Sequence, residues 1–256
     1  MPGLVTTPVP APHQLVERRR LAEVADSIST AASVAEFQTL LHAGTLALGA
    51  ERSYFASVSG DGANSACVVI LDCDPAWWHR YRAGSSLHDD PWLGYALRHA
   101  APVLTSELKP NARQNALFAQ AAAAAGFASG LVVPAHSGTL EQRFSVFCLG
   151  HSTPGFFDAP TFDAVRVGAR SIANEMHEWW ARNERERLTQ STRLSAQDLE
   201  LLERHCAGLS SKQIAAELNV SCDAVNSRFQ RIIVRLGVRT RRAAATVAVK
   251  CGLLVL

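Results

Sequence analysis

The sequence predicts an α+β fold, in which an N-terminal αβα sandwich (a sheet covered by helices) is followed by a small all-α domain of four helices. Segments with helical hydrophobic spacing alternate with short β-branched runs over the first 180 of the 256 residues. A polar, charged stretch breaks this pattern, and short helical segments with their own capping residues follow it. We expect a disordered tail at 1–14, a first domain at 15–180, a linker at 181–193 and a second domain at 194–256.

The first domain is expected to begin with helices and to close with a long one. Apolar residues recur at helical spacing over 15–48, and the final segment, 159–183, is amphipathic. Between them lie runs rich in β-branched and aromatic residues, which are typical of strands. The expected strands are 54–58, 66–71, 130–134 and 144–149, and the expected helices between them are 75–83, 91–100 and 111–125.

Composition excludes several classes of protein. With 48% apolar and 19% charged residues the chain can bury a sizeable core, unlike collagen-like or wholly disordered proteins. No stretch reaches the roughly 18 uninterrupted apolar residues of a membrane span, and Met1–Pro12 lacks the features of a signal peptide. The six cysteines are scattered without metal-ligand spacing. We therefore expect a cytoplasmic protein with reduced thiols, no metal and no membrane contact.

Small polar residues and a glycine divide the second domain into helices. Each of its first three helices is expected to follow a serine that can cap it, and Gly208 can end the first in a left-handed conformation. The expected caps are Ser195 (with Asp198 three residues on), Ser210 or Ser211, and Ser221. A fourth helix is expected over 241–250.

The spacing within 211–225 is typical of a helix-turn-helix. Ala215 is small enough for two helices to cross closely, Asn219 tolerates the positive φ of a turn, and Val225 supplies a core contact. The second helix of such a motif lies in the major groove of double-stranded DNA. We expect base contacts from Asp223, Asn226, Ser227, Gln230 and Arg231, and phosphate contacts from Lys212, Ser221, Arg228, Arg235 and Arg239.

The distribution of charge favours the same interpretation. Residues 194–256 carry nine Lys/Arg against five Asp/Glu, whereas residues 1–180 carry 12 against 16. A basic module on an otherwise acidic chain is typical of contact with a polyanion. The alternative is a small helical bundle with a solvated basic face and no nucleic-acid partner.

The second domain also resembles a known family. Over about sixty residues, Leu194–Leu254 is similar to the C-terminal domain of LuxR-type transcription regulators, at positions that include Leu202, Gly208, Ile214, Ala215, Val225 and Leu236. The sequence departs from the family at Asp198, usually Glu, and at Arg228, commonly His or Lys. The resemblance implies that the fourth helix contributes to the contacts of a homodimer.

The first domain resembles the acyl-homoserine-lactone-binding domain of quorum-sensing LuxR regulators. The positions that match in order and spacing are Trp77, Tyr81, Asp90-Pro91, Pro102 and Gly130–Pro134. The resemblance implies an enclosed cavity in which Trp77 donates to a lactone carbonyl, Asp90 accepts from an amide, and Tyr81 forms a wall. Aliphatic side chains would surround the acyl chain, namely Val68, Ile70 and Val132. Taken without the resemblance, the Trp and Tyr are typical of core packing, and Asp-Pro is typical of a turn or a helix start.

Two positions of this pocket depart from the family pattern. Thr105 stands where a Trp usually closes over the lactone ring, and Cys73 stands where a Tyr usually hydrogen-bonds to the signal. Loss of a polar contact removes on the order of 1–3 kcal/mol of binding free energy. We predict that the pocket takes a different or bulkier ligand, binds standard lactones weakly, or has dispensed with a ligand. We expect no cofactor other than a possible acyl-homoserine lactone or related ligand.

Three functional hypotheses follow from these patterns. The first is a homodimeric DNA-binding regulator in which a small-molecule signal completes the core of the first domain. The second retains the DNA-binding module and makes the first domain a ligand-independent dimerisation unit. The third is an enzyme built on Cys148 and His151, which the sequence disfavours because it contains no nucleophile elbow, phosphate-binding loop or metal cluster.

Overall fold

The computed structural model describes residues 12–59, 66–78, 90–108, 113–137, 143–192, 194–250 and 253–254. By its internal contacts the chain divides into two compact units. One comprises residues 1–56, 69–135 and 145–176, and the other comprises residues 57–68, 136–144 and 177–256. The predicted tail at 1–14 lies largely outside the described residues, since the first described helix begins at residue 12.

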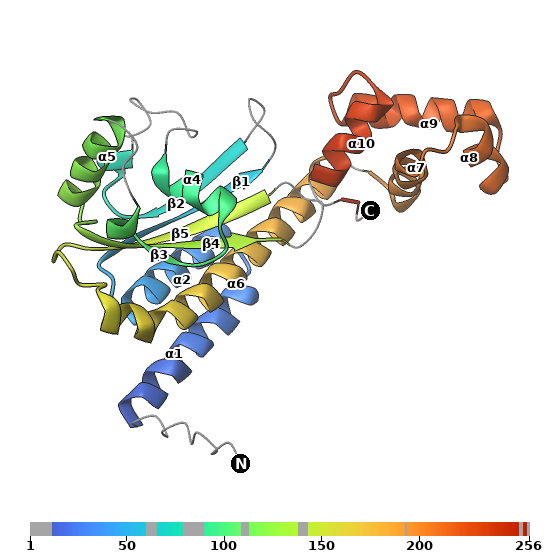
Figure 1. The fold of residues 1–256 in the computed structure, drawn as a ribbon. Coiled ribbons are helices and arrows are strands. Elements are labelled where there is room, and N and C mark those ends of the chain that lie inside the picture. The colour runs from blue at the N-terminus through green and yellow to red at the C-terminus, as the bar shows by residue number, and fades with distance from the viewer. Residues whose placement is uncertain are drawn as a thin grey trace, which may run out of the picture. The chain divides into compact units, whose positions relative to one another are not determined.

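Helices surround one sheet and then continue alone to the C-terminus (Figure 1). The helices are α1 (Pro12–Ser29), α2 (Val34–Ala47), α4 (Pro91–Arg98), α5 (Arg113–Ala124), α6 (Ala159–Thr192), α7 (Ala196–Cys206), α8 (Ser211–Glu217), α9 (Cys222–Arg235) and α10 (Arg241–Lys250), with the short 3-10 helix η2 (Thr105–Glu107). The strands are β1 (Arg52–Ser59), β2 (Ala66–Asp72), β3 (Val103–Leu104), β4 (Ser129–His136) and β5 (Arg143–His151). The helix predicted at 75–83 is described only at 75–78, where it is helical.

The five strands form one sheet in the order β2-β1-β5-β4-β3. The edge strand β3 pairs antiparallel with β4, placing Val103 opposite Val132. The sequence did not predict β3, because two residues are too few to show a period-2 pattern. The predicted αβα sandwich is confirmed, with helices on both faces of the sheet (Figure 1).

One face of the sheet packs against α2, which in turn contacts α6. Phe55 of β1 meets Phe37 of α2 edge-on with ring centroids 5.4 Å apart. The hydroxyl groups of Thr45 and Ser53, both buried, are hydrogen-bonded at 2.6 Å, which satisfies two polar groups inside the core. The other face of the sheet carries α4 and α5, and the candidate pocket lies on that side.

The long helix α6 extends further than the sequence predicted. We expected it to end near residue 183 and a linker to occupy 181–193, but the helix continues to Thr192. Arg and Glu are good helix formers, so the charged composition of 181–193 is compatible with helix as well as with a linker. The boundary between the two domains therefore remains a prediction.

The first three helices of the second domain begin where the caps predict, and the fourth, α10, spans the predicted residues 241–250. Ser195, Ser210 and Ser221 each accept a hydrogen bond from the backbone N–H three residues on. Gly208 ends α7 with φ +87°, as expected. The core of this domain is built from residues on all four helices, including Leu202, Ile214, Phe229 and Ala248, each 0% exposed.

Candidate functional site

A buried aromatic cluster fills part of the space between the sheet and the α4–α5 layer. Tyr54 of β1 lies at its centre, with ring centroids 5.9 Å from Trp77, 6.2 Å from Trp92 and 6.1 Å from Phe127. Trp77 and Phe127 stack at 5.3 Å. All four side chains are at most 4% exposed. The chain itself therefore supplies the aromatic core of this region.

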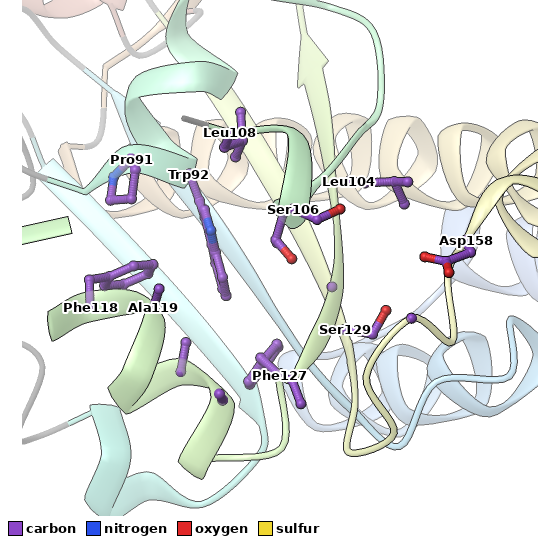
Figure 2. Close-up of a pocket in the computed structure, with 16 residues that line it drawn as sticks. Pro91, Trp92, Leu104, Ser106, Leu108, Phe118, Ala119, Phe127, Ser129 and Asp158 are labelled. Atoms are coloured by element: carbon purple, nitrogen blue, oxygen red, sulfur yellow. The ribbon is translucent and has the colours of Figure 1, made fainter. Parts of the chain in front are cut away.

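A pocket of about 230 Å³ lies beside this cluster. Figure 2 shows Trp92, Phe118 and Phe127 along one side of it, and Ser129 and Asp158 on the other. The pocket is lined by α4, η2, α5, the start of β4 and the loop before α6, at residues Pro91, Trp92, Leu104, Thr105, Ser106, Leu108, Phe118, Ala119, Ala122, Ala123, Phe127, Ala128, Ser129, Gly130, Gly155 and Asp158. An apolar wall with a few polar groups is the usual form of a small-molecule site.

Thr105 is the predicted ligand residue that the structure places in the pocket wall. It packs closely on Gly130, where a Cβ atom would lie 2.7 Å from Thr105 Cγ2. Residue 105, which departs from the family pattern, therefore lies in the wall of this pocket. That threonine leaves more room here than a tryptophan stays a prediction.

Asp90 is 2% exposed and caps α4. Its Oδ1 accepts hydrogen bonds from the backbone N–H groups of Trp92 (2.7 Å) and Leu93 (3.1 Å). The helix-start interpretation of Asp90-Pro91 is therefore confirmed. A contact from Asp90 to an amide of a ligand stays a prediction.

The other predicted ligand residues lie at different depths. Trp77 belongs to the aromatic cluster and Val132 is fully buried in β4. Val68 is 37% exposed and Ile70 half-buried, both in the edge strand β2. Burial, together with Asp72 and Asp74, raises the pKa of the Cys73 thiol to about 12, so this side chain stays neutral. Tyr81 lies outside the described residues.

Sequence reasoning missed Tyr54, Trp92 and Phe127. Each is a large aromatic residue next to a predicted element boundary, and such residues are common in any core. The sequence could have indicated Trp92 as a site residue, because it directly follows the Asp90-Pro91 pair that matches the family pattern. The cluster itself could be found only from the fold, because it joins β1, α4 and the loop before β4.

The pair proposed for an enzyme, Cys148 and His151, does not form a nucleophilic site. The two residues are three positions apart on β5, so their side chains point to opposite faces of the sheet. Burial raises the pKa of the Cys148 thiol well above its ordinary value, which disfavours the reactive thiolate. His151 instead stacks on Phe156, with ring centroids 3.7 Å apart.

The turn between α8 and α9 has the predicted helix-turn-helix geometry. Asn219 adopts φ +54°, and no other described non-glycine residue has a positive φ. Ala215 (6% exposed) and Val225 (1% exposed) are buried in the shared core. The local sequence therefore holds α9 at a defined angle to α8.

Several predicted DNA contacts lie on the exposed side of α8 and α9. Asp223, Ser227, Gln230 and Arg231 are exposed on α9, as is its cap Ser221. Lys212 is exposed on α8 and Arg239 follows α9 in an exposed turn. This arrangement gives a polar helix face flanked by cations, which is what major-groove recognition needs.

Arg228 and Arg235, which we expected at phosphates, bind a carboxylate of their own chain. Asp198 Oδ1 accepts from Arg228 Nε at 2.8 Å, and Asp198 Oδ2 accepts from Arg235 Nη1 at 3.0 Å. Burial by itself raises the pKa of Asp198, but hydrogen bonds from Ser195 and Arg228 outweigh it and hold the pKa below its ordinary value. Phosphate contact by these arginines stays a prediction, and the structure gives them an internal role.

Asn226 is also engaged within the domain. Its Oδ1 accepts from Arg241 Nη2 at 2.9 Å, and it is only half-exposed. The predicted base-contacting set is thus divided into freely exposed side chains and one side chain that Arg241 holds.

Comparison with protein families gives two matches. Residues 33–178 match the family described as "Autoinducer binding domain", and residues 192–248 match "Bacterial regulatory proteins, luxR family". Together these matches span the sheet, the helices from α2 to the first part of α6, and the helix-turn-helix. A search of curated proteins finds no match.

Solved structures with the same fold include two of SdiA. "SdiA in complex with octanoyl-rac-glycerol" has TM-score 0.74 and 15% identity and covers 96% of this chain and 98% of that chain. Escherichia coli SdiA has TM-score 0.73 and 16% identity, covering 94% and 99%. The N-acylhomoserine lactone-dependent CepR2 from Burkholderia cenocepacia has TM-score 0.54 and 18% identity, and the match covers 64% of this chain and 95% of that chain.

A search of the described residues for membrane-spanning helices finds none with the required length and apolar character.

Proposed function

Because this chain belongs to the LuxR family of bacterial regulators, which join an autoinducer-binding domain to a helix-turn-helix, we propose that it is a homodimeric, DNA-binding transcription regulator. We further propose that it responds to a small amphiphilic signal such as an acyl-homoserine lactone. The observation that carries the proposal is the exposed polar face of α9 beside a correctly capped turn.

The DNA-binding role is supported by the positions of the cations in the second domain, since some are exposed and others pair with Asp198. Lys212, Arg231 and Arg239 are exposed, whereas Arg228 and Arg235 stabilise the position of α9 through Asp198. A rigid recognition helix with free polar side chains reduces the ordering cost of binding. Two such helices in a dimer would read a two-fold site.

The ligand-responsive role is supported by the pocket beside Thr105. Its aromatic and alanine-rich wall suits an aliphatic or cyclic group, and Ser106, Ser129 and Asp158 lie at its polar side (Figure 2). A carboxylate accepts hydrogen bonds, so this side favours a head group with N–H or O–H donors. Octanoyl-glycerol, present in the SdiA structure, has hydroxyl donors that a lactone ring lacks. We therefore include acylglycerols among the candidate ligands.

A second candidate function rests on the aromatic cluster. Tyr54, Trp77, Trp92 and Phe127 pack on one another, with ring centroids 5.3 to 6.2 Å apart. A core that is already filled needs no ligand to fold, so the first domain would serve mainly for dimerisation. The same DNA-binding activity would then be constitutive.

One set of measurements on the full-length protein separates these candidates. The protein is purified without added signal, its mass in solution is measured by light scattering, and binding to promoter DNA is measured by gel shift. Thermal unfolding is then followed with N-octanoyl-homoserine lactone, with octanoyl-rac-glycerol, and with neither. A ligand that binds the native state stabilises it by RT ln(1 + [L]/Kd), so Tm rises with the logarithm of ligand concentration once the concentration exceeds Kd.

The outcomes are distinct. A rise in Tm with either amphiphile, together with tighter DNA binding, supports the ligand-responsive dimer. Dimeric protein that retards DNA and shows no Tm change with either compound supports the ligand-independent candidate.

Replacing Gln230 and Arg231 with alanine should abolish the gel shift, whereas Arg166→Ala on the exposed face of α6 should not. Unchanged retardation by the Gln230/Arg231 variant would contradict both candidates.

A further inference from the structure

Arg241, the first residue of α10, contacts side chains of both α8 and α9. Its Nη1 donates to Ser211 Oγ at 2.6 Å, and its Nη2 donates to Asn226 Oδ1 at 2.9 Å. Its Cζ also lies 4.4 Å from the centroid of the Phe229 ring, which is fully buried. Two hydrogen bonds and a ring contact hold the planar guanidinium in one orientation.

This orientation determines which side of the Asn226 amide faces outward. A guanidinium has N–H donors and no acceptor, so it must meet the oxygen of the amide and not its NH₂ group. Nδ2 then points away from Arg241, where it donates a long contact of 3.8 Å to Cys222 Sγ on the exposed first turn of α9. Arg241 takes one of the two lone pairs of the amide oxygen, whereas both N–H groups of Nδ2 lie on the other side of the amide. Asn226 is therefore biased toward donating to another molecule.

A donor-biased asparagine reads DNA differently from a free one. A free asparagine recognises adenine by accepting from N6 and donating to N7 at once. With one lone pair of its oxygen taken by Arg241, Asn226 accepts less readily, whereas Nδ2 can still donate. Guanine offers two acceptors in the major groove, O6 and N7, whereas cytosine offers only a donor there.

Building on the proposed binding to duplex DNA, we propose that Arg241 is a positioning residue that makes Asn226 read base edges chiefly as a hydrogen-bond donor. Asn226 then favours guanine over adenine and rejects cytosine at the base position that it faces. Arg241 acts on sequence preference through Asn226, so its effect is confined to that one position.

The test is selection of binding sites from a random duplex library by the full-length protein, followed by sequencing. Asn226→Ala first identifies the base position that residue 226 reads, as the position whose preference disappears. The wild type should select guanine there over adenine, by about 5- to 100-fold. Asn226→Asp is nearly isosteric and keeps an oxygen for Arg241, but cannot donate, so it should lose the guanine preference. Arg241→Ala releases the amide oxygen and should shift the selected base toward adenine.

Arg242 provides the matched control, because it is the exposed neighbour of Arg241 on the same helix. Arg242→Ala should leave the preference at every position unchanged, even if overall affinity falls. If Arg241→Ala proves unfolded by circular dichroism, Asn226→Asp decides the question alone. Retention of the guanine preference by Asn226→Asp, or an adenine preference in the wild type, would overturn the inference while the proposed function stands. Failure of the wild type to select any motif would overturn both.

Discussion

Asp198 and Arg228, the two positions at which the second domain departs from its family's pattern, are hydrogen-bonded to each other. Arg228 Nε lies 2.8 Å from Asp198 Oδ1, and the Asp198 side chain is 4% exposed. Arg228 also reaches Gln197 Oε1 at 2.7 Å, so one arginine fastens α9 to the start of α7. An aspartate is one methylene shorter than a glutamate, and the longer arginine spans the difference.

This contact predicts a coupled pair. Arg228→His should shorten the reach to Asp198 and lower the free energy of unfolding by about 1–3 kcal/mol, because Oδ1 of a buried carboxylate loses its hydrogen-bond donor. Adding Asp198→Glu should recover part of that loss, since the longer acid restores the span. The four proteins of this double-mutant cycle are compared by urea unfolding. Strictly additive effects would show that the two departures are independent.

Asp198 also predicts an acid dependence of stability. Its pKa is lower in the folded state than in the unfolded chain, so its contribution is fully present above about pH 4. That contribution is lost as pH falls through the folded-state value. Asp198→Asn should therefore be less stable than the wild type at pH 7, with a difference that shrinks at pH 3. Thermal unfolding of both proteins across this range measures the effect, and a constant difference would contradict it.

His177 predicts a second pH effect in a higher range. It is 1% exposed in α6, and Ser137 Oγ lies 2.7 Å from its Nε2. Burial, with Arg143 and His136 nearby, lowers the pKa of His177 to about 4. An unfolded histidine takes up a proton near pH 6.5, so the unfolded state binds more protons between pH 6.5 and 4. Stability should fall over this interval as pH is lowered, by roughly 2–4 kcal/mol.

The control for this effect is a histidine that is exposed. His177→Gln should flatten the pH dependence between pH 6.5 and 4, whereas His99→Gln should leave it as in the wild type. Chemical denaturation at several pH values reports both. An unchanged slope in His177→Gln would show that another group titrates there.

Thr105 predicts a gain of stability that opposes ligand binding. Its side chain lines the pocket of about 230 Å³, so Thr105→Trp should occupy part of that volume and bury more apolar area. We expect a higher Tm in the absence of amphiphile and a smaller rise when octanoyl-rac-glycerol is added. Thr105→Ser serves as control, because it keeps the cavity. A larger ligand-induced rise in Thr105→Trp would mean that the ligand does not use this pocket.

Lys212 predicts a uniform loss of DNA affinity. It is exposed on α8 and is expected to neutralise one phosphate. Lys212→Ala should weaken binding to all sequences alike and reduce the slope of log affinity against log salt by about 1. Titrations at several salt concentrations give the slope. A change in selected sequence with no change in slope would assign Lys212 to base recognition instead.

Sequence and structure agree best where interactions are local. Ser195, Ser221 and Asn219 act on backbone groups within three or four residues, so their roles as caps and turn residue were predictable. The two-residue strand β3 and the extra turns of α6 were not, because a short pairing or a charged helix leaves no distinctive pattern.

The chain's residues alone determined the α+β order of elements, the capped helix-turn-helix and the family resemblance, since each depends on spacing along the chain. Tertiary structure alone decided how those side chains are used. It brought Asp198 to Arg228, turned the Asn226 amide toward Arg241, and gathered Tyr54 with Trp92 beside the pocket. The physical reason is distance: these partners are 15 or more residues apart, and their meeting depends on how whole helices and strands pack.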